Sequence, residues 1–117
     1  MKKYLSKLSL TALLFALFVN INLFSQCTTA GFGLYLSNLN PVCDGTPQLL
    51  VGCEYADEYS TVNLTAGVTY TFASTVPTDY LTVADDATNT PLVFGTSPIV
   101  FNCLVTGLYR IYTHLSA

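Results

Sequence analysis

The chain has 117 residues, with four basic and seven acidic side chains and a formal net charge of −3. Three of the four cations are lysines near the N-terminus, so Arg110 is the only cation in the rest of the chain. One arginine cannot form the basic patch that binds a phosphate backbone or an anionic membrane surface, which excludes nucleic acid as an expected partner.

The N-terminal segment has the pattern of a secretory signal peptide. Three lysines, at positions 2, 3 and 7, precede an apolar run over residues 10–19. A membrane-spanning helix needs about 20 apolar residues, whereas a basic start and a run of about 7–15 are typical of a cleavable export signal. We therefore expect removal of residues 1–26, with cleavage after Ser25 or Gln26, and no remaining membrane span. Lipidation at Cys27 is the alternative, but Gln26 stands where a small residue is required.

Export predicts a periplasmic, extracellular or cell-surface location. It leaves one small domain of net charge −6, since one arginine then stands against seven acids. An even number of cysteines in an oxidising compartment favours disulfides over metal ligation. The turn over residues 44–47 favours a bridge between Cys43 and Cys53, although the other pairings stay open. The disulfide candidates are Cys27, Cys43, Cys53 and Cys103.

Turn residues recur through the exported part at intervals typical of short strands. No helical period follows Gln26. We predict an all-β fold, a small antiparallel β-sandwich of jelly-roll or immunoglobulin-like type over residues 41–117, with residues 27–40 as an N-terminal linker or arm. The expected strands, in chain order, are residues 48–51, 59–64, 68–73, 80–83, 92–94, 99–104 and 108–115.

The clearest alternation lies in residues 68–73. There Val68, Tyr70 and Phe72 share one face and two threonines share the other, which predicts a strand with one core face and one solvent face. The preceding strand, residues 59–64, turns into it through Gly67, which can adopt the positive φ of a tight hairpin. A β-hairpin is therefore predicted here.

Two later strands differ in their pattern. Residues 99–105 are largely apolar on both faces, which predicts a central strand covered on both sides. In the last strand we expect Tyr109 and Ile111 to point inward. The opposite, solvent-facing side carries Arg110, Tyr112 and His114.

Catalysis is not expected. His114 is the only histidine, and the G-x-S-x-G motif of serine hydrolases is absent. Two carboxylates can hydrolyse a glycosidic bond, but they need a cleft and a raised pKa, and the sequence indicates neither. The acidic cluster of Glu54, Asp57 and Glu58 is therefore predicted to be a solvated loop.

Calcium is the one metal that the sequence suggests. Asp85 and Asp86 begin an oxygen-rich segment, and Asp79 precedes them by a few residues. Calcium binds such carboxylate and backbone oxygens, but Asp and Asn also favour turns, and the spacing is not that of an EF-hand loop. A turn is the main expectation, with calcium as the alternative and no other cofactor.

Arg110 is expected to pair with an acid on a neighbouring strand, Glu58 or Asp79. The functional alternative is a sheet face that stacks on a sugar ring or a peptide, because tyrosine combines apolar area with a polar tip. The candidate ligand-binding residues are Tyr59, Tyr80, Arg110, Tyr112 and His114.

Four motifs in residues 41–114 suggest a family. The sequence reads E-Y-S from Glu58, G-x-x-Y-x-F from Gly67, D-Y-x-T from Asp79 and R-x-Y-x-H from Arg110. This combination resembles a repeated β-module of large secreted or cell-surface proteins from bacteria that use type IX secretion. More distantly, it resembles the bacterial pre-peptidase C-terminal type of β-sandwich. Both resemblances imply an accessory or adhesive module, often in tandem, without catalytic residues.

Two departures from the first family bear on this expectation. Asp57 stands where such modules usually have glycine, and the sequence stops at Ala117, where they usually continue to another cysteine. The resemblance thus implies the first module of a larger protein, cut short at its C-terminal end, with Cys103 lacking its usual partner. The expected function is adhesion or binding of a glycan or cell-surface polymer. The alternatives are a structural spacer and a fragment of a secreted hydrolase.

Overall fold

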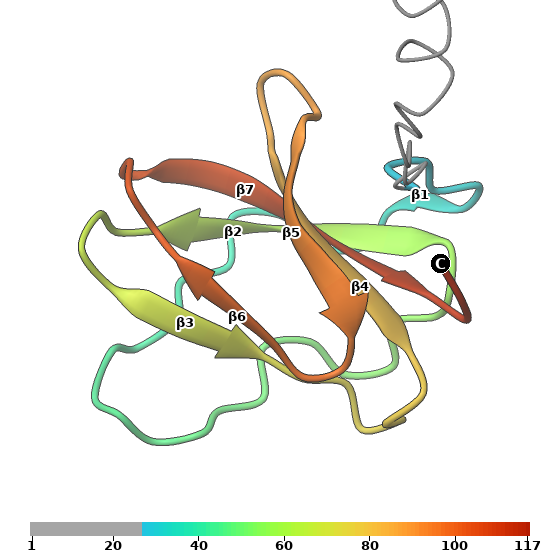
Figure 1. Ribbon diagram of the computed structural model, residues 1–117, viewed down its shortest axis with the longest axis horizontal. Coiled ribbons are helices and arrows are strands. Elements are labelled where there is room, and N and C mark those ends of the chain that lie inside the picture. The colour runs from blue at the N-terminus through green and yellow to red at the C-terminus, as the bar shows by residue number, and fades with distance from the viewer. Residues whose placement is uncertain (1–26) are drawn as a thin grey trace, which may run out of the picture.

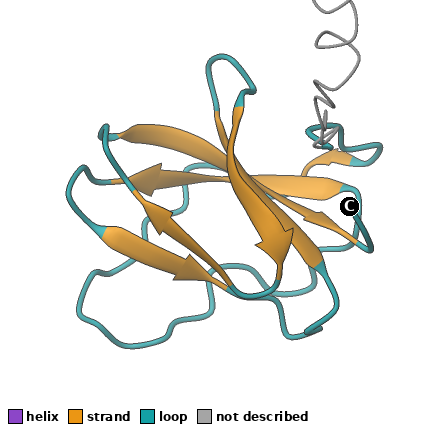
Figure 2. Ribbon diagram, in the orientation of Figure 1, coloured by secondary structure: helices purple, strands orange, loops and turns teal. Residues whose placement is uncertain are grey.

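The computed structural model describes residues 27–117, and the predicted signal peptide lies outside them. Within this range the chain forms seven strands and no helix, which confirms the all-β class (Figures 1 and 2). No helix in this range is thus long and apolar enough to cross a membrane. The strands are β1 (Gly33–Leu34), β2 (Glu58–Leu64), β3 (Thr69–Phe72), β4 (Tyr80–Asp85), β5 (Pro91–Thr96), β6 (Ile99–Asn102) and β7 (Gly107–His114).

The strands form two sheets that face each other (Figure 1). The larger sheet has the order β1-β2-β7-β4-β5, and the smaller sheet pairs β3 with β6. Strand β7 lies at the centre of the larger sheet and runs antiparallel to both β2 and β4. The register of β7 with these two strands therefore determines which side chains share each face of the sheet.

The hydrophobic core lies between the two sheets. The alternation predicted for residues 68–73 is confirmed, because Tyr70 and Phe72 are buried whereas Thr69 and Thr71 are exposed. Burying a side chain of this size contributes about 1.5–3 kcal/mol. The core cluster consists of Val62, Leu64, Tyr70, Phe72, Leu81, Val83, Ile99, Phe101, Cys103 and Tyr109.

The predicted hairpin between residues 59–64 and 68–73 is wrong. Strand β2 pairs with β7 in the larger sheet, and β3 pairs with β6 in the smaller one. Gly67 does adopt a positive φ of 83°, and its amide donates to the carbonyl of Cys103 at 2.8 Å. The turn thus carries the chain from one sheet to the other, since both alternating segments bury their apolar faces in the core from opposite sides.

Two other strand expectations are also wrong. Strand β6 is not covered on both sides, because it pairs only with β3 and leaves Val100 and Asn102 exposed. Residues 48–51 form no strand and belong to the loop between β1 and β2. An apolar run does not identify which strands lie beside it. A short apolar run does not even establish that a strand is present.

The N-terminal arm, residues 27–40, is attached to the larger sheet along β2. Strand β1 pairs parallel with β2. The amide of Tyr35 donates to the carbonyl of Tyr59 at 2.8 Å, and the amide of Leu39 donates to that of Thr61 at 2.9 Å. These bonds satisfy the backbone groups of an edge strand that would otherwise be open to another chain.

The predicted disulfides do not form among the described residues, because all four cysteines are free. Cys43 does not reach Cys53. Its Sγ lies 3.7 Å from the hydroxyl of Tyr70 instead. Cys103 is buried, and its Sγ donates to the carbonyl of Val105 at 3.1 Å. The thiol of Cys103 therefore serves as a core side chain.

Replacing Leu64 with alanine tests the position of the core. Leu64 is 1% exposed, so Leu64→Ala is expected to lower the free energy of unfolding by about 2–5 kcal/mol. Leu115 is 77% exposed, so the matched change Leu115→Ala is expected to alter it by less than about 0.5 kcal/mol. Urea unfolding measures both, and equal losses would contradict this assignment of the core.

Candidate functional site

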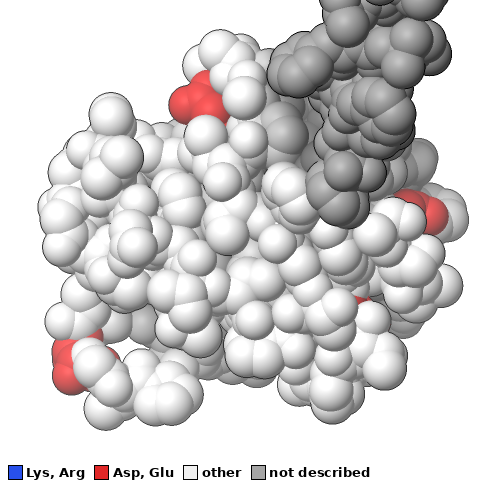
Figure 3. Space-filling model, in the orientation of Figure 1, with Lys and Arg blue, Asp and Glu red and all other residues white. Residues whose placement is uncertain are grey.

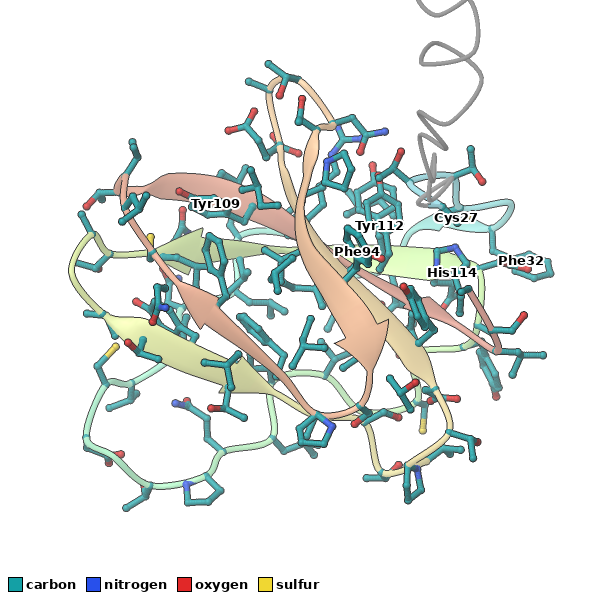
Figure 4. The ribbon with its side chains drawn as sticks, in the orientation of Figure 1. Cys27, Phe32, Phe94, Tyr109, Tyr112 and His114 are labelled. Carbon is teal, nitrogen blue, oxygen red and sulfur yellow. The ribbon has the colours of Figure 1, made fainter. Side chains whose placement is uncertain are left out.

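Aromatic side chains form a row across the outer side of the larger sheet. Tyr59 on β2 lies opposite Tyr112 on β7, Tyr112 lies opposite Thr82 on β4, and Thr82 lies opposite Phe94 on β5. Partners in register point to the same side of a sheet, so these four side chains share one surface, on the opposite side from the core. Figure 4 shows Phe94, Tyr112 and His114 grouped in one part of the fold. The aromatic face, as we call this surface, comprises Tyr59, Tyr80, Phe94, Arg110, Tyr112 and His114.

The rings of this surface pack on one another. The ring centroids of Tyr59 and Tyr112 are 5.1 Å apart, and those of Tyr80 and Phe94 are 6.4 Å apart, both at an interplanar angle of 31°. The rings of Tyr112 and His114 stack at 6.1 Å. Such pairs contribute about 0.5–1.5 kcal/mol each beyond their burial, so the aromatic face is held in one arrangement.

Arg110 is fixed by three contacts on the same surface. Its Nε lies 2.7 Å from Oδ1 of Asp86, its Nη1 donates to the hydroxyl of Tyr112 at 3.4 Å, and its guanidinium lies 5.0 Å from the ring centroid of Tyr59. The hydrogen bonds with Tyr112 and Asp86 raise the pKa of Arg110 above its ordinary value. The guanidinium is therefore a permanently charged, well-placed donor.

The predicted partners of Arg110, Glu58 and Asp79, are wrong. The register places Arg110 opposite Ala84, near the end of β4. The chain leaves β4 just beyond that point, so Asp86 is the acid within reach.

Tyr112 and His114 point to the predicted side of the sheet but are not exposed to solvent. Tyr112 is 1% exposed and His114 is 4% exposed. The hydroxyl of Tyr112 donates to Oδ1 of Asn89 at 2.6 Å, and Nδ2 of Asn89 donates to the carbonyl of Thr28 at 3.0 Å. The Nε2 of His114 lies 2.8 Å from the carbonyl of Thr29. The prediction that these two side chains face solvent is thus wrong. The N-terminal arm is bonded directly to His114 and, through Asn89, to Tyr112.

The polar contacts of the His114 imidazole are with the N-terminal arm and with Asp57. Its Nε2 also lies 3.6 Å from Oδ1 of Asp57, and its Nδ1 is buried with no hydrogen-bond partner. Within residues 27–117, no side-chain hydroxyl or thiol is hydrogen-bonded to the imidazole.

The more accessible part of the aromatic face lies around Tyr112. Phe94 is 39% exposed, whereas Tyr59, Tyr80, Arg110 and Asp86 are each intermediate in exposure. Sequence reasoning missed Phe94, and it named Asp86 only as a calcium candidate and not as the partner of Arg110. No local motif marks them, since only the pairing of β5 with β4 and the turn between these strands bring them to this surface.

The three candidate calcium ligands do not come together. Asp79 precedes β4, and Asp85 ends it. Oδ1 of Asp85 accepts hydrogen bonds from the amide and the hydroxyl of Thr88 at 2.8 and 2.9 Å, and these bonds lower the pKa of Asp85. Asp86 is paired with Arg110. Across residues 27–117 there is no cluster of three or more His, Cys, Asp or Glu side chains that could hold a metal, so the turn accounts for Asp85.

The acidic cluster before β2 is not uniformly solvated. Oε2 of Glu58 accepts a hydrogen bond from the amide of Tyr55 at 2.8 Å in an exposed position. Glu54 is half-buried, and its Oε2 accepts a hydrogen bond from Oγ of Ser60 at 3.0 Å. Burial raises the pKa of Glu54 from 4.5 to about 7; the hydrogen bond from Ser60 opposes this rise, and the charge of Glu58 adds to it. The expectation of a solvated loop is therefore wrong for Glu54.

No protein-family model, curated protein or solved structure matches the chain. The resemblance to secreted β-modules thus remains an expectation from sequence motifs.

Glu54 should make stability depend on pH. Its raised pKa favours the neutral carboxyl in the folded state, so this stabilisation is full below about pH 4.5 and is lost as the pH rises through about 7. Glu54→Gln removes the charge that the folded protein disfavours at pH 8, whereas at pH 4 the wild-type carboxyl is already neutral. The effect of the substitution on the free energy of unfolding is therefore expected to be more stabilising at pH 8 than at pH 4 by about 1–2 kcal/mol, a value that allows for screening by solvent. Urea unfolding at the two pH values measures this, and a change of equal size at both would contradict the assignment.

Proposed function

We propose that this chain is an exported, non-catalytic β-sandwich module that binds a carbohydrate or a related neutral cell-surface polymer. The observation that carries the proposal is the aromatic face, in which Tyr59, Arg110 and Phe94 are held in place and keep part of their surface accessible. The leader pattern supports export, and the two facing sheets support the sandwich. The sequence motifs support a place as a module of a larger secreted or cell-surface protein.

The chemistry of this surface suits a sugar. The apolar C–H side of a sugar ring packs on an aromatic ring, and its hydroxyl groups need donors and acceptors at fixed positions. Phe94 offers the ring, while Arg110 and Asp86 offer a donor and an acceptor that already hold each other at 2.7 Å. Because these groups are ordered before binding, little conformational entropy is lost when a ligand binds.

The charge distribution favours a neutral ligand. Removal of the leader would leave a net charge of −6, which repels polyanions. Figure 3 shows one face of the molecule, on which a few separate acidic positions and no basic side chain are visible. A neutral glycan is not repelled by the negative net charge.

A structural spacer without a ligand is the second candidate. The burial of Tyr112 and His114 beside the N-terminal arm favours it, because hydrogen-bonding groups of these two side chains are already used within the chain. The two candidates differ in whether the accessible part of the aromatic face has a ligand.

A glycan array followed by titration of the best ligand separates the candidates. Tyr59→Ala and Arg110→Ala are each expected to weaken binding at least about tenfold, which corresponds to about 1.4 kcal/mol. Tyr55→Ala is the matched control, because Tyr55 is an exposed tyrosine in the loop before β2 and is not part of the aromatic face. It should leave the affinity unchanged.

Two outcomes would contradict the proposal. Silence across the array would favour the spacer. An equal loss of affinity in the Tyr55 control would show that the ligand binds elsewhere.

A further inference from the structure

A cavity of about 270 Å³ lies on the other side of the larger sheet from the aromatic face. One wall is the loop between β1 and β2, and the others come from β2, β3, the segment after β3, β4 and β7. The cavity is smaller than the pockets that hold drug-sized ligands, which suits a ligand of a few heavy atoms. Its apolar lining includes Leu39, Leu50, Val62, Phe72, Leu81 and Ile111.

Glu54 gives this cavity a specific polar group. Its Oε2 is bonded to Ser60, whereas its Oε1 is buried and has no hydrogen-bond partner among residues 27–117. Buried carboxylate oxygens are normally paired, because loss of hydration without a replacement is costly. Glu54, which lines the cavity, therefore carries a buried oxygen that the described part of the chain does not satisfy.

The described chain has no cation to offer this carboxylate. The other titratable groups near Glu54 are Cys53 of the same loop, which lines the cavity, and Glu58 of β2, whose charge disfavours ionisation of Glu54. Strands β3, β4 and β7 contribute no titratable side chain to the lining. Arg110, the only arginine or lysine of residues 27–117, is paired with Asp86 on the opposite side of the sheet. Below a pH of about 7 a proton neutralises the carboxylate. Above that pH, a compensating positive charge would have to come with a ligand.

We propose that the cavity binds a small alkylammonium ligand, an ammonium group on a short apolar body. The ammonium pairs with the carboxylate of Glu54, and the apolar body packs against Leu50, Val62 and Phe72. An ammonium has three donors, so the hydroxyl oxygens of Ser60 and Thr113, which also line the cavity, can accept from the others. This site is independent of the proposed carbohydrate binding.

Neutral and anionic ligands of the same shape fit less well. An alcohol brings a single donor and no positive charge to offset the carboxylate, whereas an ammonium brings three donors and the compensating charge. A carboxylate ligand would be repelled by Glu54. Charge at the polar end of the ligand is thus the feature that the site selects.

Binding should depend on pH through Glu54. The pKa of Glu54 is about 7, so the ammonium meets an ionised carboxylate above this value and a neutral carboxyl below it. Affinity should therefore rise as the pH increases through about 7, and by linkage the bound cation should lower the pKa of Glu54.

NMR titration with isopentylamine at pH 8 tests the site, with isopentanol and isovalerate as probes of the same shape. The amine is expected to bind at least about tenfold more tightly than the alcohol, and Glu54→Gln is expected to remove at least this advantage. Asp44→Asn is the control for the lost negative charge, because Asp44 lies in an exposed turn of the same loop and does not line the cavity. It should bind the amine as the wild type does, and so should Tyr59→Ala.

The proposal is overturned if the wild type shows no saturable shift with the amine, if the alcohol binds equally well, or if Glu54→Gln retains full affinity. Should that variant not fold, the carboxyl carbon of Glu54 is titrated in the wild type. With amine present, its midpoint should fall clearly below that of the free protein. An unchanged midpoint would overturn the proposal.

Discussion

The antiparallel register of β7 between β2 and β4 is the constraint on which the rest of this structure depends. Because side chains alternate along a strand, this register sends Tyr109 and Ile111 into the core and Arg110, Tyr112 and His114 to the opposite side. A shift by one residue would exchange the two sets and would place a guanidinium in the hydrophobic core. The core and the aromatic face are thus two consequences of the same pairing.

The two candidate sites use different physical means to hold polar groups. On the aromatic face, the guanidinium of Arg110 is held by Asp86, by Tyr112 and by the ring of Tyr59. This surface is therefore ordered before any ligand binds. In the cavity, the loop between β1 and β2 places Glu54 among apolar side chains with one oxygen unmatched. The first arrangement favours broad, weak recognition of an uncharged surface. The second favours a small ligand that carries the missing charge.

The alternation of residues was sufficient to predict part of this arrangement. It correctly placed Tyr70 and Phe72 in the core, it correctly turned Tyr109 and Ile111 inward, and it grouped Tyr59, Arg110, Tyr112 and His114 on one side of a sheet. It did not predict that Tyr112 and His114 would be buried, because the residues bonded nearby, Thr28 and Thr29, lie far away along the chain. It also missed Phe94, the pairing of Asp86 with Arg110 and the burial of Glu54, because these depend on strand pairing and on the path of a long loop.

The sequence by itself determined the all-β class, the inward and outward sides of the clearest strands, and the scarcity of cations after the N-terminal lysines. These properties follow from residue type and from the period of two, which are local. Only the tertiary structure decided that β2 pairs with β7 rather than with β3, that the N-terminal arm lies along β2, and that Glu54 lines a cavity. The physical reason is that a strand's two faces are encoded by its own residues, whereas its neighbours are selected by which apolar faces can be buried together across the whole chain.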